Sequence, residues 1–267
     1  KFLKYILFVK NNKNKDLSLT LKKLGPTWIK LGQFLSTRPD IIGLELSDKL
    51  KNLQDKVEPF PKSKTIEILK EEFKEEYMDT FIDIMPSETA ASIAQVHKGT
   101  IKLNSKEYDV AIKILRPNIE REIKKDLGTF FIVANLLEKI SKEAKRLRLT
   151  EVVKTLAESL SMEIDLRLEA AAQSEIKDNI INDEYFDVPN VYWDLTRKNI
   201  LISEWVNGIP AKNINKIAEQ GLDAKKIGKN ILKIFLITSI RDGLFHADMH
   251  QGNLFIEKNE KIIAVDF

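Results

Sequence analysis

The chain has 267 residues, of which 43% are hydrophobic and 31% are charged, with a net charge of +3 and no cysteine. Its length allows two lobes, and its composition excludes a disordered chain. The lack of cysteine excludes disulfides, thiolate metal sites and a cysteine nucleophile, which suits a cytoplasmic location. No apolar run is long enough to span a bilayer, and the strongest runs, 130–137 and 231–240, are typical of buried helices.

The positive charge is concentrated at the start of the chain. Residues 1–30 carry eight lysines and one aspartate, so the remainder is slightly acidic. A lysine-rich face in contact with water is the simpler interpretation. The alternative is a basic segment on anionic lipid, with residues 2–9 as its apolar side, which would make the protein membrane-associated. We do not expect nucleic-acid binding, because no aromatic–basic interleaving accompanies the charge.

The first third of the chain is predicted to be helical. Residues 17–55 form helices interrupted at 24–28 and 36–40, and Pro26 suits a first helical turn. Residues 62–73 have the pattern of an amphipathic helix.

Strands are predicted mainly in the middle of the chain. Residues 90–116 indicate a pair of strands, and 119–182 return to helix in several pieces, one of them capped by Thr150. A β-hairpin turning at 195–198 follows. The chain is then helical to about residue 241 and ends as loop and strand.

One of these strands carries a lysine on an otherwise apolar stretch. Alternation places Ala111 and Lys113 on one face and the branched side chains Val110, Ile112 and Ile114 on the other. A lysine beside a small residue suits a nucleotide site, because the ammonium meets phosphate oxygens and the alanine leaves room for a base. The alternative is an edge-strand lysine that faces solvent.

The loop sequence "FHADMHQGNLFI" (245–256) is more specific. The carboxylate of Asp248 can be placed beside a hydroxyl that is to lose its proton. Asn253 and Asp266 supply oxygen ligands of the kind that suit Mg²⁺. A zinc site is the alternative, with His246, Asp248 and His250 as ligands. A strand lysine, then D-x-x-x-x-N, then D-F is the order of the protein-kinase motifs.

Two features depart from that set. The segment "TAASIAQVH" (89–97) stands where a glycine-rich loop would cover the phosphates, and alanine does not give the backbone the same freedom. The acid that would pair with Lys113 is far along the chain, and Glu169 is the best candidate, beyond a helical insertion.

These departures, together with "KLGQ" (30–33), "AASIAQVH", "VAIK", Glu163-x-Asp165, "HADMHQGN" and "VDF", resemble the UbiB family of atypical kinase-like proteins, linked to ubiquinone biosynthesis. The similarity runs from about residue 20 to the end. The chain differs from the family's usual pattern at Gln251, where a proline is common, and at Ala94, where a glycine is common.

The resemblance implies an α+β, two-lobed, protein-kinase-like fold. We expect an N-terminal helical extension at 1–60, an N-lobe at 61–206 with a helical insert at about 119–160, and the start of a C-lobe at 207–267. The C-lobe would be incomplete, because the sequence stops just after the D-F of the metal motif.

The resemblance also assigns residues to an ATP and Mg²⁺ site. It places Lys113 at the phosphates, Glu169 in its ion pair, Asp248 as catalytic base, and Asn253 and Asp266 as Mg²⁺ ligands. Nucleotide contacts would come from Ala111, from the backbone around Glu204 and Val206, and from the loop residues Ala90, Ala91, Ser92, Ile93 and Ala94.

A regulatory role is implied for the K-x-G-Q helix, which in the family lies over the peptide-substrate site, near the E-x-D acids. Its candidates here are Lys30 and Gln33, with Glu163 and Asp165 as the acids. Gly32 in mid-helix costs about 1 kcal/mol relative to alanine, which close packing against another backbone would justify. Asp165 and Glu169 form a like-charge i,i+4 pair, so cations are expected nearby, with Lys30 and Lys113 as candidates.

The resulting functional prediction is an ATP-dependent phosphotransferase or ATPase that supports ubiquinone biosynthesis, acts on a small molecule or lipid such as a quinone precursor, and makes peripheral membrane contact. One alternative is a pseudokinase-like scaffold that binds nucleotide and lipid without turnover. Another is a phosphotransferase of the aminoglycoside or choline type, which would not need "KLGQ" or the E-x-D acids.

Overall fold

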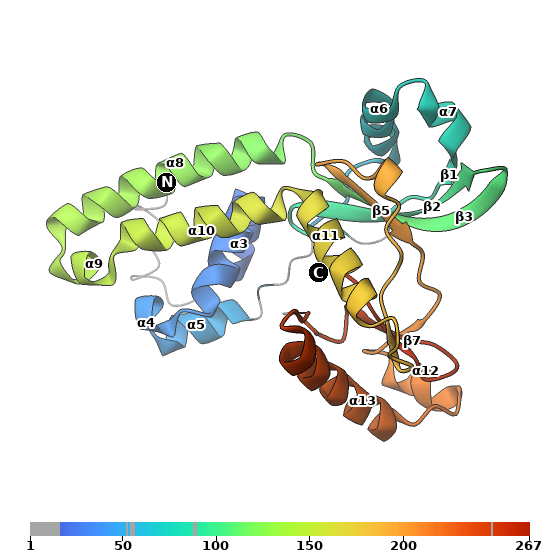
Figure 1. Cartoon of the computed structure of the whole chain (residues 1–267). Helices are drawn as coiled ribbons and strands as arrows, with labels where there is room; N and C mark the ends of the chain where they lie inside the picture. Colours follow the sequence, from blue (N-terminus) through green and yellow to red (C-terminus); the bar gives the residue numbers. More distant parts are fainter. Residues whose placement is uncertain (1–16, 52, 54–56, 88–89, 247) are drawn as a thin grey trace. The chain divides into compact units, whose positions relative to one another are not determined.

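The computed structural model describes residues 17–51, 53, 57–87, 90–246 and 248–267 (Figure 1). The chain divides into two compact units. The first comprises Lys1–Pro59, Thr89–Ala94 and Arg116–Ser161, and the second Phe60–Glu88, Gln95–Leu115 and Met162–Phe267. The suggested lipid-binding segment, residues 2–9, lies outside the described residues. Along the described parts of the chain, no helix combines the length and apolarity needed to cross a bilayer.

The first unit consists of helices. Its elements are α2 (Leu17–Leu24), α3 (Pro26–Ser36), α4 (Pro39–Ile42), α5 (Leu44–Lys51), α8 (Ile119–Ile140), α9 (Lys142–Leu147) and α10 (Leu149–Glu163). Helices α8 and α10 run alongside each other and are joined through α9 (Figure 1). Trp28 of α3 meets Phe130 of α8 edge-on, with ring centroids 4.7 Å apart, so the early helices pack on the insert.

The predicted helices of this unit are present, with Pro26 in the first turn of α3. Gly32 is closely packed, because a Cβ there would lie 2.6 Å from Leu53 and 2.7 Å from Leu21. The neighbours are leucine side chains rather than the backbone that was expected. The predicted cap at Thr150 is wrong: α10 begins at Leu149, and the Thr150 amide donates to Glu138 Oε1 at 2.7 Å.

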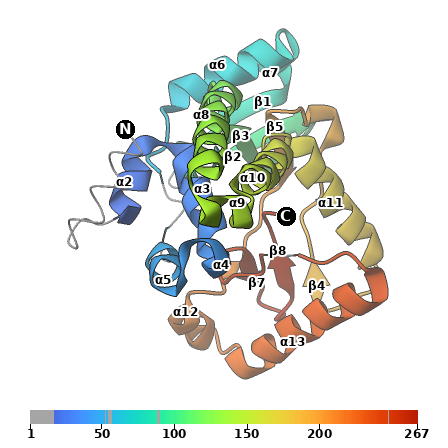
Figure 2. The same cartoon turned by 90° about the vertical axis from the view of Figure 1, so that its left-hand side faces the viewer.

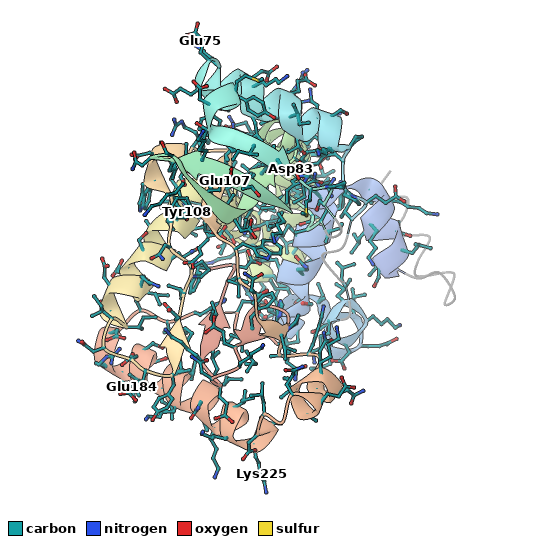
Figure 3. The ribbon with its side chains drawn as sticks, turned by 90° about the vertical axis from the view of Figure 1, so that its right-hand side faces the viewer. Glu75, Asp83, Glu107, Tyr108, Glu184 and Lys225 are labelled. Atoms are coloured by element: carbon teal, nitrogen blue, oxygen red, sulfur yellow. The ribbon has the colours of Figure 1, made fainter. Side chains whose placement is uncertain are left out.

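The second unit contains a four-stranded sheet in the order β1-β2-β3-β5. Its strands are β1 (Phe81–Ile84), β2 (Ala94–Leu103), β3 (Lys106–Leu115) and β5 (Ile200–Glu204), and the helices α6 (Lys62–Phe73) and α7 (Glu76–Thr80) precede it. Leu69, Phe73 and Tyr77 from the helices bury one face together with Val110, Ile112 and Ile114. Asp83, Glu107 and Tyr108 are exposed (Figure 3). Along 110–114 of β3, buried and half-buried residues alternate, which confirms the alternation predicted for this stretch.

A second, smaller sheet lies in the same unit, in the order β4-β8-β7-β6. Its strands are β4 (Phe186–Asp187), β6 (Ile209–Pro210), β7 (Leu254–Ile256) and β8 (Ile262–Ala264), with the helices α11 (Leu166–Asn179), α12 (Ile214–Glu219) and α13 (Ala224–Ile237). Helices α12 and α13 pack against this sheet (Figure 2). A π-helical turn, Thr238–Asp242, extends α13. Helices and two separate sheets give the α+β class that was predicted.

The predicted hairpin at 195–198 is only partly right. Its first arm contains a 3₁₀ turn, Trp193–Leu195, and only the second arm, β5, is a regular strand. The tip lies two residues later than expected, where Arg197 and Ile200 exchange backbone hydrogen bonds of 2.7 and 3.2 Å. Since Leu195 and Thr196 are buried, packing fixes a compact turn at this position.

Candidate functional site

Lys113 is the centre of a buried charge cluster in the second unit. It lies on β3, which pairs with β5 so that Lys113 faces Leu201. Its Nζ donates to both carboxylate oxygens of Glu169, on α11, at 2.7 and 2.8 Å, and it also forms an ion pair with Asp266. Only 17% of the Lys113 side chain and 13% of the Glu169 side chain are exposed. The structure thus joins a strand, a helix and the segment after β8 at one ammonium group.

The two carboxylates of this cluster stabilise the Lys113 ammonium. Burial by itself would lower the pKa of Lys113, but the carboxylates of Glu169 and Asp266 outweigh it and raise the pKa above its ordinary value. The lysine is therefore a cation at every physiological pH. Burial and the nearby Asp266 raise the pKa of Glu169, and the Lys113 ammonium opposes them. A fixed cation of this kind is what phosphate oxygens require.

Helix α11 places Glu169 because its start is firmly capped. Asp165 is the N-cap: it accepts a bond from the Arg167 amide at 3.2 Å and pairs with the Arg167 guanidinium at 2.8 and 2.6 Å. An acid in the first turn also suits the positive end of the helix dipole. Arg167 is a cation that sequence reasoning missed, and it stands beside Asp165, where the like-charge pair required one.

Asp266 and Asn253 are brought together by the β7–β8 hairpin. Leu254 pairs with Ala264, and the Val265 amide donates to the Asn253 carbonyl at 2.9 Å. Asp266 has φ +68°, a left-handed conformation that aspartate tolerates better than most residues. These contacts place the two predicted Mg²⁺ ligands at the same end of the hairpin.

The donor chemistry of this pair fits Mg²⁺. The Asn253 side chain is buried, and its Nδ2 donates to the Asp248 carbonyl at 3.3 Å, which leaves Oδ1 as an acceptor. Asp266 adds a carboxylate that is 55% exposed. Mg²⁺ commonly takes one or two protein oxygens and completes its shell with phosphate and water. Asn253 and Asp266 would therefore hold the ion.

His246 fixes the loop that carries Asp248. Its ring is buried, its Nδ1 accepts from the Asp248 amide at 3.2 Å, and its Nε2 donates to the Val265 carbonyl at 3.0 Å. The ring also packs against Phe267, with centroids 4.6 Å apart. Burial is the main cause that lowers the pKa of His246, so the ring is neutral. Sequence reasoning did not foresee this role, which ties the loop directly to the Asp266 segment.

The zinc alternative does not fit this loop. Both ring nitrogens of His246 are occupied by hydrogen bonds, and His250 Nδ1 accepts from the Gly252 amide at 2.9 Å. Over the described residues, no three His, Cys, Asp or Glu side chains come together as metal ligands.

Asp248 itself is open to solvent. Its side chain is 73% exposed, and His250 Nε2 lies 3.9 Å from its Oδ2. Its backbone, by contrast, is held: the Asp248 carbonyl accepts from the His250 amide at 2.8 Å and from Asn253 Nδ2. The carboxylate is thus carried by a fixed backbone and remains accessible from solvent.

The alanine loop belongs to the first unit and is held by Arg116. The Arg116 guanidinium donates to the Ala91 carbonyl at 3.1 and 3.2 Å and to the Glu58 carbonyl at 2.9 Å, and its amide donates to Ile93 at 2.8 Å. The loop residues Ala90, Ser92, Ile93 and Ala94 are buried. Sequence reasoning missed Arg116; an arginine that directly follows a buried strand and precedes Pro117 was the available signal.

The hinge candidates follow β5. The amides of Glu204 and Trp205 donate to the carbonyls of Asn190, at 2.9 Å, and Asp109, at 3.1 Å. Among the described residues, nothing accepts a bond from the Val206 amide. The predicted contact of this backbone with adenine stays a prediction. Ala111, the other predicted base contact, is half-buried on β3.

The K-x-G-Q residues and the E-x-D acids lie in different units. Gln33 donates to the Leu53 carbonyl at 3.5 Å, on its own helical unit, and Asp165 caps α11. The predicted approach of Lys30 and Gln33 to Glu163 and Asp165 stays a prediction.

Comparison with known proteins places this site in context. The model of the ABC1 atypical kinase-like domain matches residues 52–267. The chain is 38% identical over 256 residues to "Probable protein kinase UbiB" of Marinobacter nauticus, covering 94% of this chain and 46% of that protein. It is also 38% identical over 265 residues to the protein of the same name from Actinobacillus pleuropneumoniae, covering 95% and 48%. The chain thus spans about half the length of these curated relatives.

A solved structure shares the fold. It is the complex of Rv3197 with erythromycin from Mycobacterium tuberculosis, with a TM-score of 0.66 and 27% sequence identity, covering 89% of this chain and 58% of that one.

Proposed function

This chain belongs to the ABC1 atypical kinase-like family, and we propose that it binds ATP with Mg²⁺ and transfers or hydrolyses the γ-phosphoryl group in support of ubiquinone biosynthesis. The observation that carries the proposal is the Lys113 cluster. A permanently charged lysine, held by a helix carboxylate and adjacent to a second, half-exposed carboxylate, is the arrangement that phosphoryl-transfer sites use to bind nucleotide phosphates.

Each residue of the site has a separate task. Lys113 binds phosphate oxygens, and Glu169 keeps its ammonium in place. Asn253 and Asp266 hold Mg²⁺, which supplies charge neutralisation of the phosphates when it is bound. Asp248 accepts the proton of the attacking hydroxyl or water, since its carboxylate is exposed on a loop that His246 fixes. The Val206 amide binds adenine.

The acceptor that suits this site is a small molecule. In the family that the sequence resembles, the K-x-G-Q helix covers the peptide-substrate site, so we propose a quinone-precursor phenol or a lipid as substrate, reached by peripheral contact with a membrane. Simple hydrolysis of ATP uses the same residues with water as the nucleophile.

Turnover by the intact protein tests the proposal. Release of phosphate from Mg·ATP is measured with and without anionic liposomes and a quinone-precursor phenol. Asp248→Asn is compared with Asp83→Asn, which changes an aspartate of β1 whose side chain is 59% exposed. We expect Asp248→Asn to lower turnover by roughly 10²-fold or more, as loss of a general base does, and Asp83→Asn to leave it unchanged.

The scaffold alternative predicts a different result. It would show tight ATP binding with no turnover under any of these conditions, and Asp248→Asn would then change nothing. That outcome would overturn the enzymatic proposal while leaving nucleotide binding intact.

A further inference from the structure

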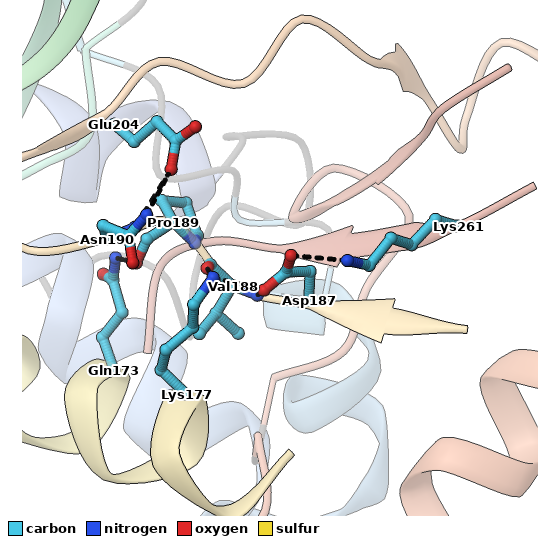
Figure 4. A network of polar contacts seen from close by, with 8 residues as sticks. All are labelled: Gln173, Lys177, Asp187, Val188, Pro189, Asn190, Glu204 and Lys261. Carbon is cyan, nitrogen blue, oxygen red and sulfur yellow. Dashed lines mark hydrogen bonds and ion pairs between the residues drawn. The ribbon is translucent and has the colours of Figure 1, made fainter. Parts of the chain in front are cut away.

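Helix α11 presents three polar side chains along one side. Glu169, Gln173 and Lys177 are spaced by four residues each, which stacks them on one helical face. Glu169 reaches Lys113, Gln173 Nε2 donates to the Pro189 carbonyl at 2.7 Å, and Lys177 Nζ donates to Asp187 at 2.5 Å. Figure 4 shows the surroundings of Gln173 and Lys177 from close by. The helix that positions Glu169 is therefore fastened at both ends.

Asp187 is the centre of the contacts near the C-terminal end of α11. Besides Lys177, its carboxylate accepts from Lys261 Nζ at 2.7 Å and from the Val188 amide at 2.8 Å (Figure 4). Its side chain is 27% exposed, and those of Lys177 and Lys261 are 31% and 28% exposed. Burial works against ionisation of this carboxyl, but the two lysines prevail and hold the pKa of Asp187 below its ordinary value.

Lys261 connects Asp187 to the metal-binding segment. It directly precedes β8, which pairs in parallel with β4 so that Asp187 faces Ile263, and Asp266 follows two residues after β8 ends. Lys261 and Asp266 thus flank β8, and Glu169 and Lys177 lie about two turns apart on α11. The two elements are joined at one end by Glu169–Lys113–Asp266 and at the other by Lys177–Asp187–Lys261.

We propose that Asp187 is a positioning residue for the nucleotide site, which holds α11 in register with β8 so that Glu169 and Asp266 meet at Lys113. In kinases the corresponding lysine–glutamate pair must be assembled for catalysis, and movement of its helix is a means of control. Here two lysines on one carboxylate oppose such movement. The expected effect on nucleotide binding rests on the proposed function, whereas the positioning of α11 rests on the contacts of Asp187.

The test uses Asp187→Asn in the intact protein, because asparagine keeps the size of the side chain and removes the charge that both lysines share. We expect the affinity for Mg·ATP to fall about tenfold, the lower range for loss of an orienting partner. Asp223→Asn is the matched control: Asp223 caps α13 through the amides of Lys225 and Lys226 and is not part of either cluster. It removes the same charge at a helix cap that asparagine fills about as well as aspartate, and it should leave the affinity unchanged.

A double-mutant cycle separates positioning from plain stabilisation. If Asp187 acts through Glu169, the loss caused by Asp187→Asn disappears in a Glu169→Gln background. Equal losses of affinity in both backgrounds would show that Asp187 stabilises the fold without acting through Glu169. Lys261→Gln, which leaves the Lys177–Asp187 pair, repeats the cycle if Asp187→Asn does not fold.

A second readout needs no nucleotide. Acetylation of Lys113 by an N-hydroxysuccinimide ester, followed by peptide mass spectrometry, reports whether its carboxylate enclosure has opened. We expect Asp187→Asn, and not Asp223→Asn, to speed this labelling severalfold. Unchanged labelling would overturn the positioning role. A wild-type protein that fails to bind ATP, with labelling that responds as expected, would overturn the proposed function alone.

Discussion

The Lys113 cluster and the Asp248 loop of the same unit differ in how their charges are placed. In the cluster, Lys113 and Glu169 are mostly buried and joined by two hydrogen bonds. In the loop, Asp248 exposes 73% of its side chain, and only its backbone is held. Groups that would bind ATP are fixed in advance, which reduces the cost of ordering them on binding. The group that would meet the acceptor stays open to it.

The largest effect on ATP binding is expected from Lys113→Met, which removes the ammonium group at the centre of the Lys113 cluster. Loss of a charge-assisted phosphate contact, with the two carboxylates left to repel the nucleotide, should weaken ATP binding by roughly 10²-fold. The free energy of unfolding should also fall, by about 3 kcal/mol, because Glu169 stays buried without its partner.

Calorimetric titration with ATP and urea unfolding measure the two effects. Lys62→Met is the control, since Lys62 lies 3.7 Å from Asp83 and is 38% exposed. Equal losses for both variants would mean that the cluster has no special part in binding.

A smaller effect, on stability alone, is expected from pH. Burial lowers the pKa of His97 and of His246, so the folded protein keeps both rings neutral. In the unfolded chain a histidine titrates near 6.5. Below that value the unfolded state takes up protons that the folded state does not, so the free energy of unfolding should decrease as the pH falls from 7 to 5.

Histidine substitutions identify which rings cause this pH dependence of the free energy of unfolding. His97→Gln should reduce the pH dependence of urea unfolding, because one of the two contributing rings is gone. His250→Gln is the comparison, since the His250 side chain is 58% exposed. A slope that follows His250 instead would contradict the assignment of the two buried rings, His97 and His246, as the source of the pH dependence.

The smallest effect is expected from Arg116→Gln. In a planar peptide the carbonyl and the following amide point in opposite directions, so the bonds from Arg116 to the Ala91 carbonyl also orient the Ser92 amide. Because the family resemblance implies that this loop contacts the phosphates, loosening this peptide should weaken ATP binding about twofold to threefold and leave adenosine binding unchanged. An equal loss for adenosine would indicate a general loss of folding rather than a contact with phosphate.

Local patterns predicted most of the fold. Alternation on β3 gave the buried face and the side of Lys113, and the helical pattern of 62–73 matches α6 to the residue. The strands of the second sheet were missed in part because they have two or three residues, too few for a pattern to show.

The charged residues of the site were predicted from the sequence, whereas the residues that hold them in place were not. Motif order pointed to Lys113 and Asp266, Glu169 was the best candidate for the partner of Lys113, and the structure brings these three together. Arg167 pairs locally with the N-cap Asp165, a contact that a helix-start pattern could have suggested. Asp187 and His246 act through partners that are set by folding, Lys261 just before β8 and the Val265 carbonyl nineteen residues away, and no spacing in the sequence encodes these contacts.

The most direct test of the contrast between a fixed binding cluster and an open catalytic acid is the dissociation constant of Mg·ATP, measured by calorimetry for Asp248→Asn beside Lys113→Met. The account predicts that Asp248→Asn binds within about twofold of the wild-type protein, while Lys113→Met loses roughly 10²-fold. If Asp248→Asn loses as much affinity as Lys113→Met, the division between binding and chemistry is contradicted.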